Sequence, residues 1–115
     1  MIEVEHLTKR YGGHTAVDDI SFTITQGRTV ALVGASGGGK TTIARLVPRF
    51  WEATEGKVLI GGINVREIAP EELMKYISFV FQNTKLFKTS LLENIKYGNP
   101  DATMEEVERA VDMAQ

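Results

Sequence analysis

The sequence predicts an α/β fold, and two observations lead to this prediction. A glycine-rich loop, Gly34–Thr42 with the sequence GASGGGKTT, follows the apolar run Val30–Val33 and precedes a segment with helical spacing. Earlier in the chain, two segments alternate apolar and polar residues, which is typical of antiparallel strands with one solvated face. A strand, a glycine-rich loop and a helix in this order form a phosphate-binding arrangement that recurs in α/β proteins.

Two antiparallel strands are predicted before the loop. The first covers residues 2–6, where apolar and acidic residues alternate. We expect His6 to be a half-buried strand residue rather than a metal ligand, because no second ligand lies at a suitable spacing. Residues 9–14 are expected to form a loop, and residues 21–25 a second strand that ends at a glycine turn.

A helix and two further strands are predicted after the loop. The helix should begin at Gly39–Lys40 and end near Pro48, because proline lacks an N–H group and clashes with the preceding turn. Residues 57–60 and 77–81 have the apolar composition of strands. Between these strands, a proline suits the first position of a short helix over residues 71–74.

Two more helices are predicted towards the end of the chain. Residues 90–93 and 103–106 have the pattern of capping boxes, in which a hydroxyl and a glutamate satisfy backbone donors at a helix start. The last helix has an apolar stripe that needs a surface to cover; its members are Met104, Val107, Val111 and Ala114. This pattern reaches Gln115 without a stop signal, so we expect a longer natural chain.

Composition excludes several classes of protein. The 115 residues carry 13 Lys and Arg against 15 Asp and Glu, a net charge of −2 without a basic run, which argues against a nucleic-acid partner. The chain has no cysteine, and therefore neither disulfides nor a thiolate metal site. Its apolar stretches are far shorter than the ~20 residues that span a bilayer. We expect a soluble piece in a reducing, cytoplasmic compartment.

The glycine-rich loop carries the chemistry. It matches G-x-x-x-x-G-K-[ST], in which backbone N–H groups converge on phosphate oxygens because glycines leave the approach open. Lys40 would contact the outer phosphates, and the Thr41 hydroxyl would bind Mg²⁺. The predicted triphosphate site comprises Gly34, Ala35, Ser36, Gly37, Gly38, Gly39, Lys40, Thr41 and Thr42. The alternative is a glycine-rich turn before an ordinary helix.

Three features in register with this loop resemble the first half of the ATP-binding cassette of ABC transporters. They are Tyr11 before the loop, Gln82 at the end of an apolar strand, and the segment 86–98, LFKTSLLENIKYG, whose sequence is most similar to that of exporter-type cassettes. The resemblance covers essentially the whole chain. It implies a P-loop NTPase fold, a RecA-like half of the cassette with an N-terminal antiparallel β portion. Residues 1–85 would form the incomplete ATP-binding core and residues 86–115 the beginning of the helical subdomain.

The resemblance also implies roles for single residues. Tyr11 would stack on adenine, and Val17 would pack beside the base or ribose, although a core valine is an equal alternative. Gln82 would reach Mg²⁺ and the attacking water, so Lys40 and Gln82 are the catalytic candidates, and Thr41 and Gln82 the metal ligands. In this family, strands from the absent half lie between residues 30–33 and 77–81, so both segments should have bare backbone groups and exposed apolar faces.

Motifs that the family has and this chain lacks limit the expected activity. There is no Leu-Ser-Gly-Gly-Gln signature, no strand that ends in Asp-Glu, and no histidine after the loop. We expect the intact cassette to be an ATPase that powers export, while these residues bind ATP and Mg²⁺ without efficient turnover. The implied partners are transmembrane domains, in the same chain or a separate subunit, and a second cassette, at the cytoplasmic side of the membrane.

Other functions stay open at this point. A soluble ABC-type ATPase without a membrane partner would share the same motifs. A nucleotide-binding module without hydrolysis would do so too. A GTPase is least favoured, because the chain has no Asn-Lys-x-Asp motif for guanine recognition and because Tyr11 is suited to stacking on adenine.

Overall fold

The computed structural model describes residues 1–115 and divides into two compact units, Met1–Ser78 and Phe79–Gln115. The expected boundary between ATP-binding core and helical subdomain, at residues 85 and 86, stays a prediction. No helix combines the length and the apolar character that crossing a membrane would require.

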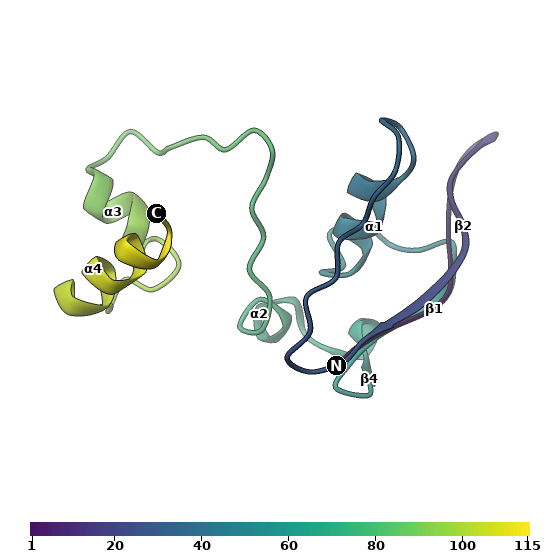
Figure 1. Cartoon of the computed structure of the whole chain (residues 1–115), viewed down its shortest axis with the longest axis horizontal. Helices are drawn as coiled ribbons and strands as arrows, with labels where there is room; N and C mark the ends of the chain where they lie inside the picture. The colour runs from purple at the N-terminus through teal and green to yellow at the C-terminus, as the bar shows by residue number, and fades with distance from the viewer. The chain divides into compact units, whose positions relative to one another are not determined.

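The first unit contains a four-stranded antiparallel sheet with the order β2-β1-β3-β4 (Figure 1). Strand β1 spans Ile2–Tyr11, β2 His14–Ile24, β3 Glu55–Ile60 and β4 Ile63–Asn64. The central strand β1 pairs with β2 on one side and with β3 on the other. The predicted strands at the start of the chain, at 21–25 and at 57–60 are therefore confirmed, and the first two are longer than expected.

The predicted loop over residues 9–14 is wrong except at its tip. Strand β1 continues to Tyr11, which lies opposite His14, and only Gly12 and Gly13 form the turn. The turn closes this tightly because Gly12 has a φ of +55°, a conformation that glycine adopts without steric cost. Tyr11 is therefore the last residue of a paired strand.

The prediction that His6 is half-buried is also wrong, and the cause is a β-bulge. The pairing of β1 with β2 shifts between Val4 and Leu7, and His6 has a φ of +48°. The additional residue reverses the alternation of side chains, so that Leu7 is fully buried while the His6 ring is exposed and lies 2.7 Å from Asp19. On β3, a Cβ at Gly56 would lie 2.2 Å from the His6 carbonyl oxygen, so this bulge requires glycine there.

The core of the first unit lies between the sheet and three short helices. These are α1 at Lys40–Leu46, the 3₁₀ helix η1 at Val65–Glu67 and α2 at Pro70–Leu73. The predicted helix starts at Lys40 and Pro70 are confirmed, as is the end of α1 before Pro48. The buried core residues are Val4, Leu7, Leu46, Val58, Val65 and Leu73.

The strands predicted at residues 30–33 and 77–81 are wrong for this chain, because neither segment is one of the four strands of the sheet. Several of their apolar side chains are exposed, Val33 by 92% and Val80 by 87%, whereas Ile77 is partly buried against the core. A strand needs a partner for its backbone hydrogen bonds, and these residues find none among the four strands of the sheet. The expectation of exposed apolar faces is thereby confirmed at residues 30–33 and only in part at residues 77–81.

The second unit contains α3 at Leu91–Lys96 and α4 at Met104–Met113. Both predicted capping boxes are confirmed. The Glu93 amide donates to Ser90 Oγ at 3.1 Å, and the Glu106 amide donates to Thr103 Oγ1 at 3.2 Å. Within the predicted stripe of α4, Val107 is buried and the other three members are exposed.

Candidate functional site

The glycine-rich loop lies directly against strand β2, and Gly39 makes this approach possible. Gly39 has a φ of +87° and precedes the first residue of α1. A Cβ at this position would lie 2.4 Å from the Ala16 carbonyl oxygen and 3.4 Å from Val17 Cγ2. No side chain fits into this space, so glycine is required for both the backbone conformation and the packing.

Lys40 closes the loop from the helix side. Its Nζ donates to the Gly34 carbonyl and, at 2.9 Å, to the Ala35 carbonyl. The Gly38 amide also donates to the Ala35 carbonyl, at 3.1 Å. The ammonium group is therefore held at the start of the loop, where phosphate oxygens could replace the two carbonyl oxygens as its acceptors.

The loop residues fit a phosphate chain. A Cβ at Gly37 would meet nothing within 4 Å, whereas one at Gly34 would lie 3.9 Å from Lys40 Nζ. The glycines keep most of the loop backbone free of side chains, and Lys40 adds one ammonium group; amides and an ammonium group are the donors that polyphosphates require. All nine predicted loop residues are brought together in this loop and the first turn of α1.

Thr41 is exposed in that first turn, next to Lys40. The chain holds no group of three or more His, Cys, Asp or Glu side chains that could bind a metal ion. The Thr41 hydroxyl fits one position around a Mg²⁺ ion that phosphate oxygens and water would otherwise surround. Its role as a metal ligand stays a prediction.

Tyr11 lies at the end of β1 and is 42% exposed. Its ring forms an edge-on contact with the Trp51 ring, with centroids 5.8 Å apart and planes at 84°. The Nζ of Lys9 lies 5.0 Å from the Tyr11 centroid. The ring is thus partly free for stacking and is contacted by two residues that sequence reasoning did not single out.

The two remaining predicted site residues have different surroundings. Val17 is only 2% exposed and lies beside the Gly39 backbone, which is the environment of a core valine. Gln82 is exposed and belongs to the second unit. The contact of Val17 with a base or ribose, and the roles of Gln82 in metal binding and catalysis, stay predictions.

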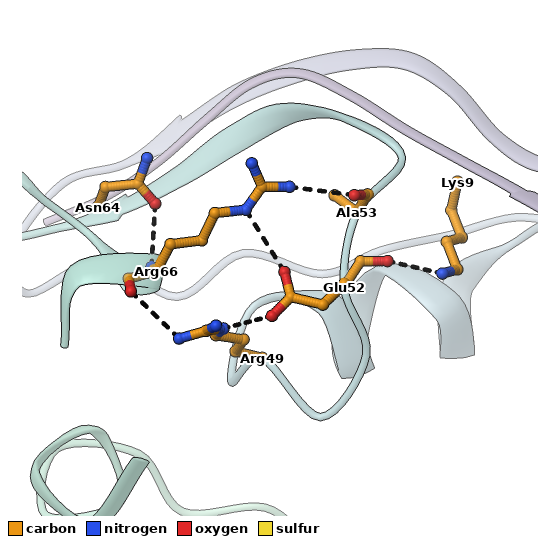
Figure 2. Close-up of polar contacts among 6 residues, drawn as sticks. All are labelled: Lys9, Arg49, Glu52, Ala53, Asn64 and Arg66. Carbon is orange, nitrogen blue, oxygen red and sulfur yellow. Dashed lines mark hydrogen bonds and ion pairs between the residues drawn. The ribbon is translucent and has the colours of Figure 1, made fainter. Parts of the chain in front are cut away.

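A polar cluster holds the segment that follows α1, as Figure 2 shows. The Glu52 carboxylate accepts a hydrogen bond from Arg49 Nε at 2.6 Å and lies 3.4 Å from Arg66 Nε. Lys9 Nζ donates to the Glu52 carbonyl at 2.6 Å, and Arg66 Nη2 donates to the Ala53 carbonyl at 3.0 Å. These bonds tie residues 49–53 to β1 and η1.

The charge of Glu52 is stabilised by this cluster. The hydrogen bond from Arg49 lowers the pKa of the Glu52 carboxyl below its ordinary value of 4.5, and the positive charges of Arg49 and Arg66 add to the effect while partial desolvation opposes it. The sequence contained a signal for part of the cluster, since Arg49 and Glu52 are three residues apart with opposite charges. Arg66 had no such signal, because it lies on a different element.

Comparison with known proteins places the chain in a family. Residues 17–115 match the family described as ABC transporter. A Bacillus subtilis protein, YgaD, named as a multidrug export ATP-binding/permease protein, is 45% identical over 96 residues, which are 84% of this chain and 17% of that protein. A Staphylococcus aureus protein with the same kind of name is 42% identical over 115 residues, covering 98% of this chain and 20% of that protein.

A solved structure agrees with these relatives. The structure of a bacterial Atm1-family ABC exporter with ATP bound matches with a TM-score of 0.91 and 33% sequence identity. The match covers 96% of this chain and 20% of that chain. The chain therefore spans about a fifth of the length of the proteins that it resembles, and it belongs to the ABC transporter family, with the P-loop NTPase fold of the ATP-binding cassette.

Proposed function

We propose that this chain is the ATP-binding part of an exporter-type ABC transporter ATPase. The observation that carries the proposal is the loop itself: Gly39 packs against β2 where no Cβ fits, and Lys40 holds its ammonium group at the loop start. This arrangement suits a triphosphate, and Tyr11 at the end of β1 suits the adenine base.

Each residue would have a distinct task in binding. Backbone amides between Ser36 and Thr42 would donate to the phosphate oxygens, and Lys40 would exchange its carbonyl acceptors for the outer phosphates. Mg²⁺, when bound, would neutralise charge on the phosphates. Thr41 would hold the ion through its hydroxyl, and Gln82 would approach the ion and the attacking water. Tyr11 would offer one face of its ring to adenine.

Hydrolysis and transport belong to the longer protein in this proposal. Phosphoryl transfer depends on positioning and on a base or polarised water in line with the γ-phosphate, and the chain has neither an Asp-Glu strand end nor the signature sequence. The 115 residues would bind ATP with little turnover. Transmembrane domains and a second cassette would be the partners, at the cytoplasmic face of the membrane, as the names of the ATP-binding/permease relatives suggest.

Calorimetric titration of the chain with ATP in the presence of Mg²⁺ tests the proposal. Lys40→Ala should weaken binding by about ten- to a hundredfold, because a charge-assisted hydrogen bond contributes roughly 1.5–3 kcal/mol. Lys75→Ala is the matched control, since Lys75 is an exposed cation that pairs with Glu72 away from the loop; it should leave ATP binding unchanged.

Equal affinities for the parent chain and Lys40→Ala would contradict the phosphate site. The same preparations in a phosphate-release assay should show little turnover. Ordinary ATPase rates from the parent chain would refute the expectation that hydrolysis needs the longer protein.

A further inference from the structure

We propose that Trp51 is a positioning residue that orients Tyr11 for the base, and that it couples Tyr11 to the helix behind the phosphate loop. The inference rests on the proposed function, because it assumes that Tyr11 stacks on adenine. It adds a second aromatic residue, which touches Tyr11 rather than the nucleotide, to the determinants of base binding.

Tyr11 needs such support because of its place in the fold. It is the last residue of β1, next to a two-glycine turn, and is 42% exposed. A stacking ring that is free to change rotamer loses conformational entropy when the base binds, and a contact that orients the ring beforehand reduces this loss. The ring contacts that the structure shows for Tyr11 are those of Trp51 and Lys9.

The contact with Trp51 has the geometry of a specific aromatic pair. The centroid separation of 5.8 Å and the interplanar angle of 84° are those of an edge-to-face contact. Lys9 adds its ammonium group at 5.0 Å from the Tyr11 centroid and donates to the carbonyl of Glu52, the residue after Trp51. Both supports of Tyr11 therefore involve the same short segment, and Tyr11 as a whole is 42% exposed.

Trp51 is itself held by α1. The Arg45 guanidinium lies 4.6 Å from the Trp51 ring centroid, and the Trp51 amide donates to the Arg45 carbonyl at 3.3 Å. The neighbouring Glu52 is bound by Arg49 and Arg66, as Figure 2 shows. Trp51 is thus fixed by Arg45 from α1 and by the anchoring of the next residue, Glu52.

This series of contacts connects the two halves of the nucleotide site. Helix α1 begins at Lys40, which would bind phosphate, and includes Arg45, which contacts Trp51. The contacts then pass from Trp51 to Tyr11 on β1. Arg45 lies in the last turn of α1, at the opposite end from Lys40. Removal of Trp51 should therefore impair the binding of the base and leave the binding of phosphates intact.

Two ligands separate these effects: ATP, and inorganic tripolyphosphate, which lacks the base. Trp51→Ala should weaken ATP binding by about two- to tenfold, the range expected for one aromatic pair. Its affinity for tripolyphosphate should stay within about twofold of the parent value, which also shows that the variant is folded. Trp51→Phe should restore most of the ATP affinity. Tyr11→Ala should weaken ATP binding at least as much as Trp51→Ala, because it removes the stacking ring itself, and the double variant should lose little more than Tyr11→Ala.

A matched control and a spectroscopic signal sharpen the test. Tyr76→Ala removes another aromatic ring, 76% exposed, and should change neither affinity. Trp51 is the only tryptophan of the chain, so its emission should change when ATP binds and not when tripolyphosphate binds. Tyr11→Ala should abolish that change.

Equal losses of both affinities in Trp51→Ala, or no loss of ATP affinity, would overturn the inference. Additive losses in the double variant would also overturn it, because the two rings would then act independently. If the parent chain binds tripolyphosphate as tightly as ATP, the base contributes nothing to affinity. Tyr11 then has no role in base binding, and the inference is overturned. A parent chain that binds neither ligand would overturn the proposed function as a whole.

Discussion

At the scale of single residues, the site depends on glycines that differ in what surrounds them. Gly37 and Gly39 both have left-handed φ values, +81° and +87°. Gly37 has open space where a Cβ would be, whereas at Gly39 the same atom would lie 2.4 Å from the Ala16 carbonyl oxygen. A substitution of Gly37 therefore measures the cost of the backbone conformation alone, whereas a substitution of Gly39 measures that cost together with the cost of the steric overlap.

Gly39→Ala should therefore destabilise the first unit more than Gly37→Ala. The left-handed conformation costs an alanine about 1–2 kcal/mol, and the steric overlap at position 39 should add about 1–3 kcal/mol. Urea unfolding without nucleotide, followed by Trp51 emission, measures both variants. Equal midpoints for the two variants would show that β2 moves away from the loop without cost.

At the scale of elements, the segment after α1 is held by ionic and hydrogen-bonding contacts of Glu52 in addition to the packing of Val47 and Ala53 against the core. Glu52 is exposed, and its partners come from residues 49 and 66 and from the Lys9 side chain on β1. Exposed ion pairs contribute little individually. Here two cations share one carboxylate, and a third donor fixes the backbone of the same residue, so the segment is defined by several weak contacts.

The lowered pKa of Glu52 predicts how this contribution depends on pH. A carboxyl whose pKa is lowered in the folded state stabilises the fold above its ordinary value of 4.5 and loses this effect as the pH falls through the folded-state pKa. Glu52→Gln should thus destabilise the chain by less than about 1 kcal/mol at neutral pH, because the side chain is largely exposed. The difference from the parent should be smaller at a pH below 4.5 than at neutral pH.

Urea midpoints at the two pH values measure this difference. Glu67→Gln is the control, since Glu67 is an exposed carboxylate of η1. It should show no comparable dependence. A constant difference between Glu52→Gln and the parent at both pH values would mean that the amide side chain is unfavourable at this position for reasons other than charge.

At the scale of the whole molecule, two extended apolar segments lack the strands that would pair with them. Residues 30–33 lead into the phosphate loop, and residues 77–81 lead to Gln82. Both have exposed apolar side chains and backbone groups without a strand partner. Such edges favour association with other chains, so stability and solution behaviour should depend on what covers them.

The isolated chain should accordingly be only marginally stable as a monomer and should assemble as its concentration rises. Val33→Lys places a charge on a side chain that is 92% exposed and should reduce assembly. Thr84→Lys, at an exposed position outside both segments, is the control for added charge. Sedimentation velocity over a range of concentrations measures the effect. A chain that stays monomeric over the whole concentration range would contradict this view of the two segments.

Features that depend on residues close in sequence could be predicted from the sequence alone. The phosphate-loop pattern, the start of α1 at Lys40 and the capping boxes at Ser90 and Thr103 each involve residues within one or two turns of backbone. Their chemistry is local: glycine φ values, a missing proline N–H, and hydroxyl–amide bonds three residues apart. The family resemblance could be recognised from the sequence for the same reason, since its motifs are short and have a fixed spacing.

Only the tertiary structure decided features that depend on distant neighbours. The bulge at His6 arises from the pairing of β1 with two other strands, and the contact of Trp51 with Tyr11 joins residues that are far apart in the sequence. The apolar segments at 30–33 and 77–81 have the composition of strands but no partner to pair with. Residue type determines which side chains can bind phosphate, but strand pairing and burial depend on surfaces that a separate part of the chain must supply.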